Sequence, residues 1–232
     1  MIEGYAMLDP VRESLWFYSA ADYLVINAFL WRNDEALGPC LEIVRQNNLA
    51  VMAEAEEETT GKRFPFPPEE AEQLFRSYVR RTPRDDSAAS KRMMLAQAAD
   101  DIRLLCRAAK PSEEDMLLYR NVDARFAVKD AAPGGELELY GLTSTSTTGQ
   151  LIDYGRGDLR RPGQIMRIAL PAGLPALIAG GEENEVVLPP MRFLVTGVSE
   201  SDGVPLLELR ALETLDVGKL IAASEEFFSG RV

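Results

Sequence analysis

The stretch EVVLPPMRFLVTGVS, Glu185 to Ser199, decides the fold class of this chain. It holds two runs rich in β-branched and apolar residues, EVVL and MRFLVTGVS, separated only by Pro189 and Pro190. A parallel crossover needs a dozen or more residues and usually a helix. Two residues cannot supply one, so the stretch predicts antiparallel or mixed strand pairing.

The rest of the second half of the chain continues this pattern. Short β-rich runs are separated by Gly, Pro, Asp and Ser: MLLYRNV (116–122), ELYGLTSTS (138–146), QIMRIALP (164–171) and PLLELRAL (205–212). The segment DVGKLIAASEEFF (216–228) that follows them is typical of a last helix.

The first half has helical periodicity. In YSAADYLVINAFL, Ser19 is a good N-cap with Asp22 three residues on. The pattern recurs over 68–80 and 87–108, and the Pro-rich segment 54–68 is expected to be a loop. We therefore expect an α+β fold, with a helical N-terminal lobe (1–110) packed on a mixed or antiparallel two-sheet β core (111–232) in one integrated domain.

The amino-acid composition and net charge exclude several classes of function. The chain has 232 residues, 46% of them hydrophobic, and a formal net charge of −12, which is typical of a globular protein with a sizeable core. So acidic a surface repels phosphate backbones, and we expect no broad nucleic-acid binding and no membrane partner. Without histidine, Ser-His-Asp catalysis and histidine-ligated zinc are excluded, and no metal is expected.

Two further features bear on the compartment. Cys40 and Cys106 lie outside any Cys-x-x-Cys pattern, so buried thiols are the better interpretation. The start MIEGYAMLDP is acidic, without a basic segment and an apolar run, so no signal peptide or membrane span is expected. We expect synthesis in a reducing bacterial cytoplasm, with signal-less secretion or injection as an open alternative.

Three polar features interrupt the apolar runs. In chain order they are Arg120, the run Ser144-Thr145-Ser146, and the cluster Glu182, Glu183 and Glu185. Each alone has an ordinary explanation: a snorkelling arginine, a strand-forming Ser/Thr run and a solvated turn. Their occurrence together, in this order at strand ends, favours a shared site.

In these motifs the sequence resembles the arginine-serine-glutamate class of mono-ADP-ribosyltransferases, which includes bacterial toxins and vertebrate ectoenzymes. LLYRNV is similar to the family's LYRG-like strand, GLTSTS to its F-x-STS strand, and ENEVVLPP to its E-x-E-V-L-x-P motif. YSAADYLVINAFL resembles the Y-x-x-x-x-Y-x-x-I-N-x-x-L helix ahead of the family's core. The resemblance spans residues 15–198 and implies the ADP-ribosyltransferase fold, with NAD as the substrate.

Roles for three residues can be argued from chemistry beside the resemblance. A guanidinium matches a pyrophosphate with a fork of donors, which makes Arg120 the candidate for NAD binding. Breaking the nicotinamide–ribose bond builds positive charge on the ribose, and a carboxylate stabilises that charge. The resemblance gives this role to Glu185 and implies that Ser144 orients it. Thr145 or Ser146 would support the strand end or contact the ribose.

Glu183 is the candidate for the acceptor. In an extended segment it would share a face with Glu185; with a turn between them it would face the acceptor. The resemblance associates a glutamate here with arginine modification. A carboxylate can both align a guanidinium and accept its proton. Glu182 is interpreted as turn surface.

The Gly-rich segment LIDYGRGDLRRPG (151–163) carries three arginines in an acidic chain. An exposed loop and a loop that closes over phosphate and nicotinamide are equally good interpretations. The resemblance favours Tyr154 for stacking on the nicotinamide and Arg156 for the phosphate, with Arg160 and Arg161 as alternatives.

The sequence departs from the family pattern at two positions. Asn121 replaces the usual glycine after the motif arginine, where the backbone holds the nicotinamide amide, so local freedom is lower. Leu142 stands where phenylalanine is common. Neither departure removes a catalytic group.

The leading expectation is an NAD-dependent mono-ADP-ribosyltransferase, a bacterial toxin or effector that modifies arginine in a target protein. An immunity or chaperone protein is a further expected partner. The alternatives are an NAD glycohydrolase toxin, a nucleic-acid ADP-ribosyltransferase, and a non-catalytic interaction domain that kept the fold.

Overall fold

The computed structural model describes residues 10–58, 68–122, 127–148, 163–180, 184–201 and 203–231. They divide into two units. The β unit comprises the described residues of 106–216, and the helical unit those of 3–105 and 217–232. The β unit is thus inserted between two parts of the helical unit.

The first helical stretch is continuous. Helix α1 (Pro10–Phe17), the π-helical turn η1 (Tyr18–Asp22) and α2 (Tyr23–Leu30) follow one another without a break. Pro10 suits the first position because its missing N–H would have no partner there. The prediction that Ser19 caps this helix is wrong: Phe17 before it is itself helical, so the helix begins earlier.

Three longer helices follow the sequence periodicity. They are α3 (Asp34–Glu58), α4 (Pro68–Arg81) and α5 (Ala88–Ala108). The Ser87 hydroxyl accepts a hydrogen bond from the Ser90 N–H at 3.2 Å, which caps the beginning of α5. The predicted loop 54–68 is wrong at both ends: residues 54–58 are strong helix formers and continue α3, and Pro68 begins α4. The rest of that prediction, residues 59–67, lies outside the described ranges. No helix within the described ranges is long and apolar enough to cross a membrane.

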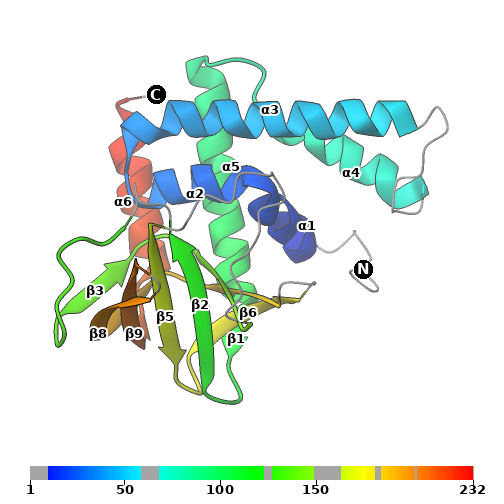
Figure 1. Cartoon of the computed structure of the whole chain (residues 1–232). Helices are drawn as coiled ribbons and strands as arrows, with labels where there is room; N and C mark the ends of the chain where they lie inside the picture. The colour runs from blue at the N-terminus through cyan, green and yellow to red at the C-terminus, as the bar shows by residue number, and fades with distance from the viewer. Residues whose placement is uncertain are drawn as a thin grey trace. The chain divides into compact units, whose positions relative to one another are not determined.

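Helix α6 (Val217–Ser229) confirms the predicted last helix. It follows the sheet in the chain but belongs to the helical unit. Its Phe228 ring stacks on Phe29 of α2 with centroids 6.0 Å apart, and both side chains are buried. Figure 1 shows α6, in red, next to the blue α2.

Nine strands pair among the described residues of the β unit, in the order β1-β6-β7-β4-β2-β5-β9-β8-β3. Their bounds are β1 (Lys110–Pro111), β2 (Met116–Val122), β3 (Glu136–Leu139), β4 (Thr143–Ser146), β5 (Gln164–Leu170), β6 (Pro175–Gly180), β7 (Glu185–Leu188), β8 (Met191–Ser201) and β9 (Val204–Thr214). The pair β5–β9 is parallel, and the other described pairs are antiparallel.

The predicted strands are found, with two differences. The run 138–146 divides into β3 and β4, because Gly141 and its neighbours interrupt the pairing. Strands β1 and β6 were not predicted: β1 has two residues, one of them proline, and β6 begins at a proline and ends at a glycine, residue types that are rare inside strands.

The link from β7 to β8 shows that the sheet curls. Only Pro189 and Pro190 lie between these strands, although β4, β2, β5 and β9 separate them in the sheet order. In a flat sheet, five spacings of about 4.8 Å would place them ~24 Å apart, whereas three Cα–Cα steps of about 3.8 Å reach ~11 Å. The sheet therefore folds back, and its β2–β4 junction is narrow, with Tyr119 opposite Ser146 as the paired position.

One hydrophobic core lies inside this curl. Ala176 and Val186, from β6 and β7, belong to the same buried cluster as Met166, Phe193 and Leu209, from β5, β8 and β9. Along β5, burial alternates with the two-residue period of a strand that has one face on the core. The expected two-sheet core thus takes the form of two halves of one curled sheet, and the predicted α+β class is confirmed.

Candidate functional site

Three neighbouring strands each carry a residue of the predicted motifs. Arg120 lies on β2, Ser144 lies on β4, and Glu185 begins β7. In the β4–β7 register, Ser144 is opposite Val187 and Ser146 is opposite Glu185. Ser144 and Glu185 are therefore diagonal neighbours on one face of the sheet, within reach of each other's side chains.

The Ser144 hydroxyl holds the Glu185 carboxylate. Ser144 Oγ donates to Glu185 Oε1 at 2.6 Å, the short distance of a charge-assisted hydrogen bond. The next residue, Thr145, is fully buried, and its hydroxyl donates to the Val186 carbonyl oxygen at 2.6 Å. Two consecutive hydroxyl groups of β4 thus fix both the side chain and the backbone at the beginning of β7.

Arg120 joins this pair from the other side of β4. It is half-buried, and its Nη1 donates to the Ser144 carbonyl oxygen at 3.2 Å. A guanidinium has five N–H donors in a planar fork. This contact orients the group next to the strand of Ser144 without exhausting its capacity to bind an anion. The three residues that the sequence motifs single out are therefore brought together.

The backbone before Glu185 takes an uncommon conformation. Asn184 has φ +47°, a left-handed value that asparagine tolerates better than most residues. Its carbonyl oxygen accepts a hydrogen bond from the Thr147 N–H at 3.4 Å. Beside it, the Ser146 hydroxyl accepts from the Thr148 N–H at 3.2 Å. The Thr147–Asn184 contact ties the end of β4 to the beginning of β7, and the Ser146–Thr148 contact closes the turn after β4.

Of the other predicted site residues, three lie within the described ranges and six lie outside them. Asn121 is half-buried on β2, opposite Ile165, while Thr145 and Ser146 are buried; cofactor binding by these three stays a prediction. Several predicted residues lie outside the described ranges, and their roles also stay predictions: Glu182, Glu183, Tyr154, Arg156, Arg160 and Arg161.

The chemistry open to the described residues follows from their charges. A carboxylate held by a hydrogen bond can stabilise a positive charge that develops beside it. The Arg120 guanidinium, on the other side of β4, can hold an anionic group such as a phosphate. The site therefore offers one anchor for an anion and one for a developing cation.

Comparison with known proteins gives matches at the level of solved structures only. No family model matches the chain, and no curated protein matches it. An ADP-ribosyltransferase from Clostridium botulinum, solved in a triclinic crystal form, has a TM-score of 0.44 and 13% identity, with 89% of this chain and 88% of that chain covered.

Two further similar structures are also from bacterial proteins. ADP-ribosyltransferase Vis, solved in complex with agmatine, has a TM-score of 0.47 and 14% identity over 91% of this chain and 78% of that one; the Vis toxin comes from Vibrio splendidus. The catalytic domain of VahC from Aeromonas hydrophila has a TM-score of 0.44 and 17% identity over 87% and 97%. These are distant likenesses, and the function proposed below rests on the site residues.

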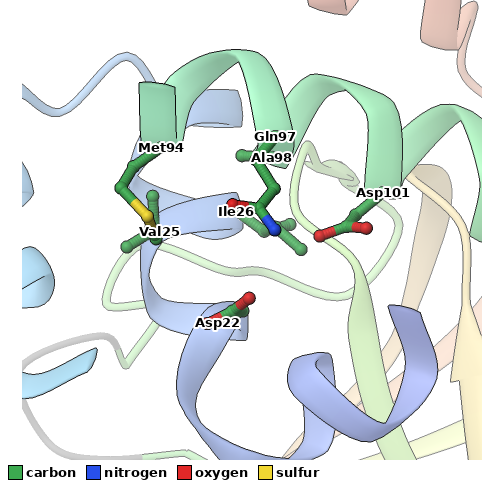
Figure 2. Close-up of a pocket in the computed structure, with 7 residues that line it drawn as sticks. All are labelled: Asp22, Val25, Ile26, Met94, Gln97, Ala98 and Asp101. Atoms are coloured by element: carbon green, nitrogen blue, oxygen red, sulfur yellow. The ribbon is translucent and has the colours of Figure 1, made fainter. Parts of the chain in front are cut away.

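A second polar cluster, which was not predicted, is buried in the helical unit. Arg81 of α4 is 6% exposed, and its Nη1 lies 3.2 Å from Asp22 Oδ2 and 2.8 Å from Asp101 Oδ2. The Ser14 hydroxyl donates to Asp101 Oδ1 at 2.6 Å. Figure 2 shows Asp22 across a small void from Gln97 and Asp101 of α5. The void is too narrow for a water molecule.

Two carboxyl groups of this cluster share one guanidinium. Asp22 Oδ1 has no hydrogen-bond partner among the described residues. Burial raises the pKa of Asp22 to about 7, although the charge of Arg81 acts in the opposite direction. The sequence does contain a signal: Asp22 falls on the buried stripe of Tyr18, Val25 and Phe29, where an acidic residue is unusual.

The cysteines have the environment of inert thiols. Cys40 and Cys106 are free and partly buried. Burial raises the pKa of both, that of Cys106 to about 12, so little reactive thiolate forms. Within the described ranges, no group of three or more Cys, Asp or Glu side chains is placed to hold a metal ion.

Proposed function

We propose that this protein is an NAD-dependent mono-ADP-ribosyltransferase that transfers ADP-ribose to arginine side chains of a target protein and releases nicotinamide. The observation that carries the proposal is the arrangement around Ser144: its hydroxyl donates to Glu185 Oε1 at 2.6 Å, and its carbonyl oxygen accepts from Arg120 Nη1 at 3.2 Å. An anion anchor and an oriented carboxylate are the two groups that cleavage of NAD needs.

Glu185 would act on the ribose. When the bond between nicotinamide nitrogen and ribose C1′ breaks, the electron pair leaves with the nicotinamide, and positive charge develops on the ribose. A carboxylate beside that charge lowers the barrier, provided that it is already in place. Ser144 supplies this placement through its short hydrogen bond to Glu185.

Arg120 would bind the pyrophosphate of NAD. Its guanidinium is charged at every physiological pH and fits two phosphate oxygens at once. The partial burial of Arg120 strengthens such a contact, because water screens it less than at an exposed position.

The acceptor assignment rests on the sequence. Glu183 would align the guanidinium of the target arginine and take up its proton as the nitrogen attacks ribose C1′. Tyr154 and Arg156, with Asn121, Thr145 and Ser146, would complete the NAD site as the resemblance implies. A target protein with a reactive arginine is the expected partner, and an immunity or chaperone protein would accompany a secreted toxin.

The first test is transfer of labelled ADP-ribose from NAD to an arginine-rich protein, together with release of free ADP-ribose. We expect Glu185→Gln to lower both activities by about a hundredfold or more, because the stabilising charge is lost. Glu200→Gln, an exposed glutamate on β8, is the matched control and should behave as wild type. Full activity in Glu185→Gln would exclude the mechanism.

The second test concerns the acceptor. Glu183→Gln should lose transfer to protein arginine, and to agmatine as a small guanidine acceptor, while NAD hydrolysis persists. Retained transfer with lost hydrolysis would contradict the role given to Glu183.

The same assays separate the alternatives. Abundant free ADP-ribose without label on any protein favours an NAD glycohydrolase toxin. Label on RNA or DNA favours a nucleic-acid acceptor. Absence of NAD binding in calorimetry favours a non-catalytic interaction domain.

A further inference from the structure

Gln164 uses its side-chain amide to hold one residue of backbone from another segment. It begins β5 and is 5% exposed. Its Oε1 accepts a hydrogen bond from the Val128 N–H at 3.0 Å, and its Nε2 donates to the Val128 carbonyl oxygen at 3.0 Å. The amide thus takes the place of a neighbouring strand, which would satisfy the same two backbone groups.

These two hydrogen bonds, here called the Gln164 clasp, lie at the beginning of β5, the strand next to that of Arg120. In the β2–β5 register, Gln164 is opposite Val122, and Met166 is opposite Arg120. Gln164 and Arg120 therefore project from the same face of the sheet as diagonal neighbours. Val128 packs against the core cluster on that face, whereas the Arg120 guanidinium turns toward Ser144 of β4, on the other side of β2.

Gly163, the residue before Gln164, makes a further hydrogen bond at the end of β2. Its N–H donates to the Val122 carbonyl oxygen at 2.9 Å. Gly163 and Gln164 thus fix the end of the Arg120 strand and the Val128 backbone with respect to each other.

The presence of a glutamine at position 164 indicates a requirement for hydrogen bonding at this buried site. A buried glutamine costs free energy unless both amide groups are paired, and an apolar side chain could fill the same space. Without the amide, however, the Val128 N–H and C=O would lose the partners they have here. The position therefore selects a group that has one donor and one acceptor side by side.

We propose that Gln164 is a positioning residue of the NAD site: it holds the Val128 backbone against the end of β2, the strand that carries Arg120, and thereby sets the affinity for NAD. This role rests on the proposed function. Gln164 itself need not touch NAD or the reacting atoms.

The first experiment compares Gln164→Met with wild type in NAD hydrolysis. Methionine keeps the length of the side chain and removes both hydrogen bonds. We expect the KM for NAD to rise about tenfold, the effect of losing one to two neutral hydrogen bonds, with kcat changed less than about twofold, because Ser144 and Glu185 keep their contact.

The matched control is Asp115→Ala. Asp115 Oδ1 accepts from the Ala172 N–H at 2.8 Å, next to the opposite end of the β2–β5 pair, where Met116 faces Leu170. This variant also loses a bond between a side chain and a backbone N–H, but far along the strands from Arg120. Its KM for NAD should equal that of wild type. An equal rise of KM in both variants would indicate general destabilisation and overturn the proposal.

A second variant, Gln164→Glu, tests the hydrogen bonds through the pH dependence of the KM for NAD, which a change in packing alone would not alter. A protonated carboxylic acid has one donor and one acceptor, like the amide, whereas an ionised carboxylate has only acceptors and faces the Val128 oxygen with negative charge. In Gln164→Glu, the ratio of its KM for NAD to that of wild type should therefore fall toward one as pH is lowered from about 8 to about 5. A KM ratio independent of pH would contradict the proposal that the two hydrogen bonds to Val128 set the affinity for NAD.

Amide exchange of Val128 tests the clasp without NAD. We expect its N–H to exchange faster in Gln164→Met than in wild type or Asp115→Ala. Unchanged exchange, or an unchanged KM in active Gln164→Met, would overturn this inference and leave the proposed function intact. Wild-type protein that neither binds nor cleaves NAD would instead refute the proposed function, and this role with it.

Discussion

Ser144 illustrates how one residue can organise a site through both its side chain and its backbone. Its hydroxyl orients Glu185, while its carbonyl oxygen receives Arg120. The two contacts place opposite charges on either side of a single β4 residue. Because β4 also pairs with β7 along four positions, the geometry depends on the strand pairing more than on loop conformation.

Ser144→Ala tests this arrangement. We expect kcat for NAD hydrolysis to fall about tenfold to a hundredfold, because the Glu185 carboxylate is no longer held in place, with little change in NAD affinity. Rates and NAD binding would be measured beside Ser199→Ala, an exposed serine on β8. Unchanged kcat in Ser144→Ala would show that the hydrogen bond does not position Glu185.

At the scale of elements, the helical unit carries a charge arrangement that depends on pH. Asp22 of η1 and Asp101 of α5 share the guanidinium of Arg81 from α4. The folded-state pKa of Asp22, about 7, is raised above its ordinary value of 3.8. Between these values, the folded state binds more protons than the unfolded state, so stability falls as pH rises through about 7.

Asp22→Asn tests this linkage. Relative to wild type, we expect the variant to become increasingly stable as pH rises from about 5 to about 8, because the buried charge is absent; each pKa unit corresponds to about 1.4 kcal/mol. Urea unfolding followed by tryptophan fluorescence reports on the helical unit, since Trp16 and Trp31 are the two tryptophans of the chain and both lie there. A difference between the proteins that is constant with pH would contradict the raised pKa.

Elements with a regular apolar period were predictable, and irregular ones were not. Strand β2 and helix α6 were predicted nearly residue by residue, because each is a continuous run of residues that favour its type of structure. The beginning of the first helix was missed because a local cap signal at Ser19 does not reveal that the preceding residues are also helical.

At the scale of the whole molecule, the helical unit is built from two distant parts of the chain. Helix α6 joins it only after the complete β unit. Phe228 of α6 joins the two parts by stacking on Phe29 of α2. Such pairing between the two parts has a large sequence separation, which slows folding.

Phe228→Ala tests the dependence on α6. We expect the free energy of unfolding of the helical unit to fall by about 3 kcal/mol, since a fully buried aromatic side chain is removed. Phe227→Ala, which removes the adjacent half-buried ring, is the control and should cost less. Tryptophan fluorescence in urea measures both, and equal losses would contradict the importance of the Phe29–Phe228 contact.

The sequence by itself determined the fold class and most strands and helices, and it singled out Arg120, Ser144 and Glu185 as candidates, because periodicity and short motifs are local properties. The tertiary structure decided which of these side chains meet. The diagonal Ser144–Glu185 contact depends on the register between β4 and β7. The clasp of Gln164 on Val128 and the burial of Asp22 beside Arg81 also join residues far apart in the chain. No local pattern encodes these pairings, because they arise only when distant segments pack together.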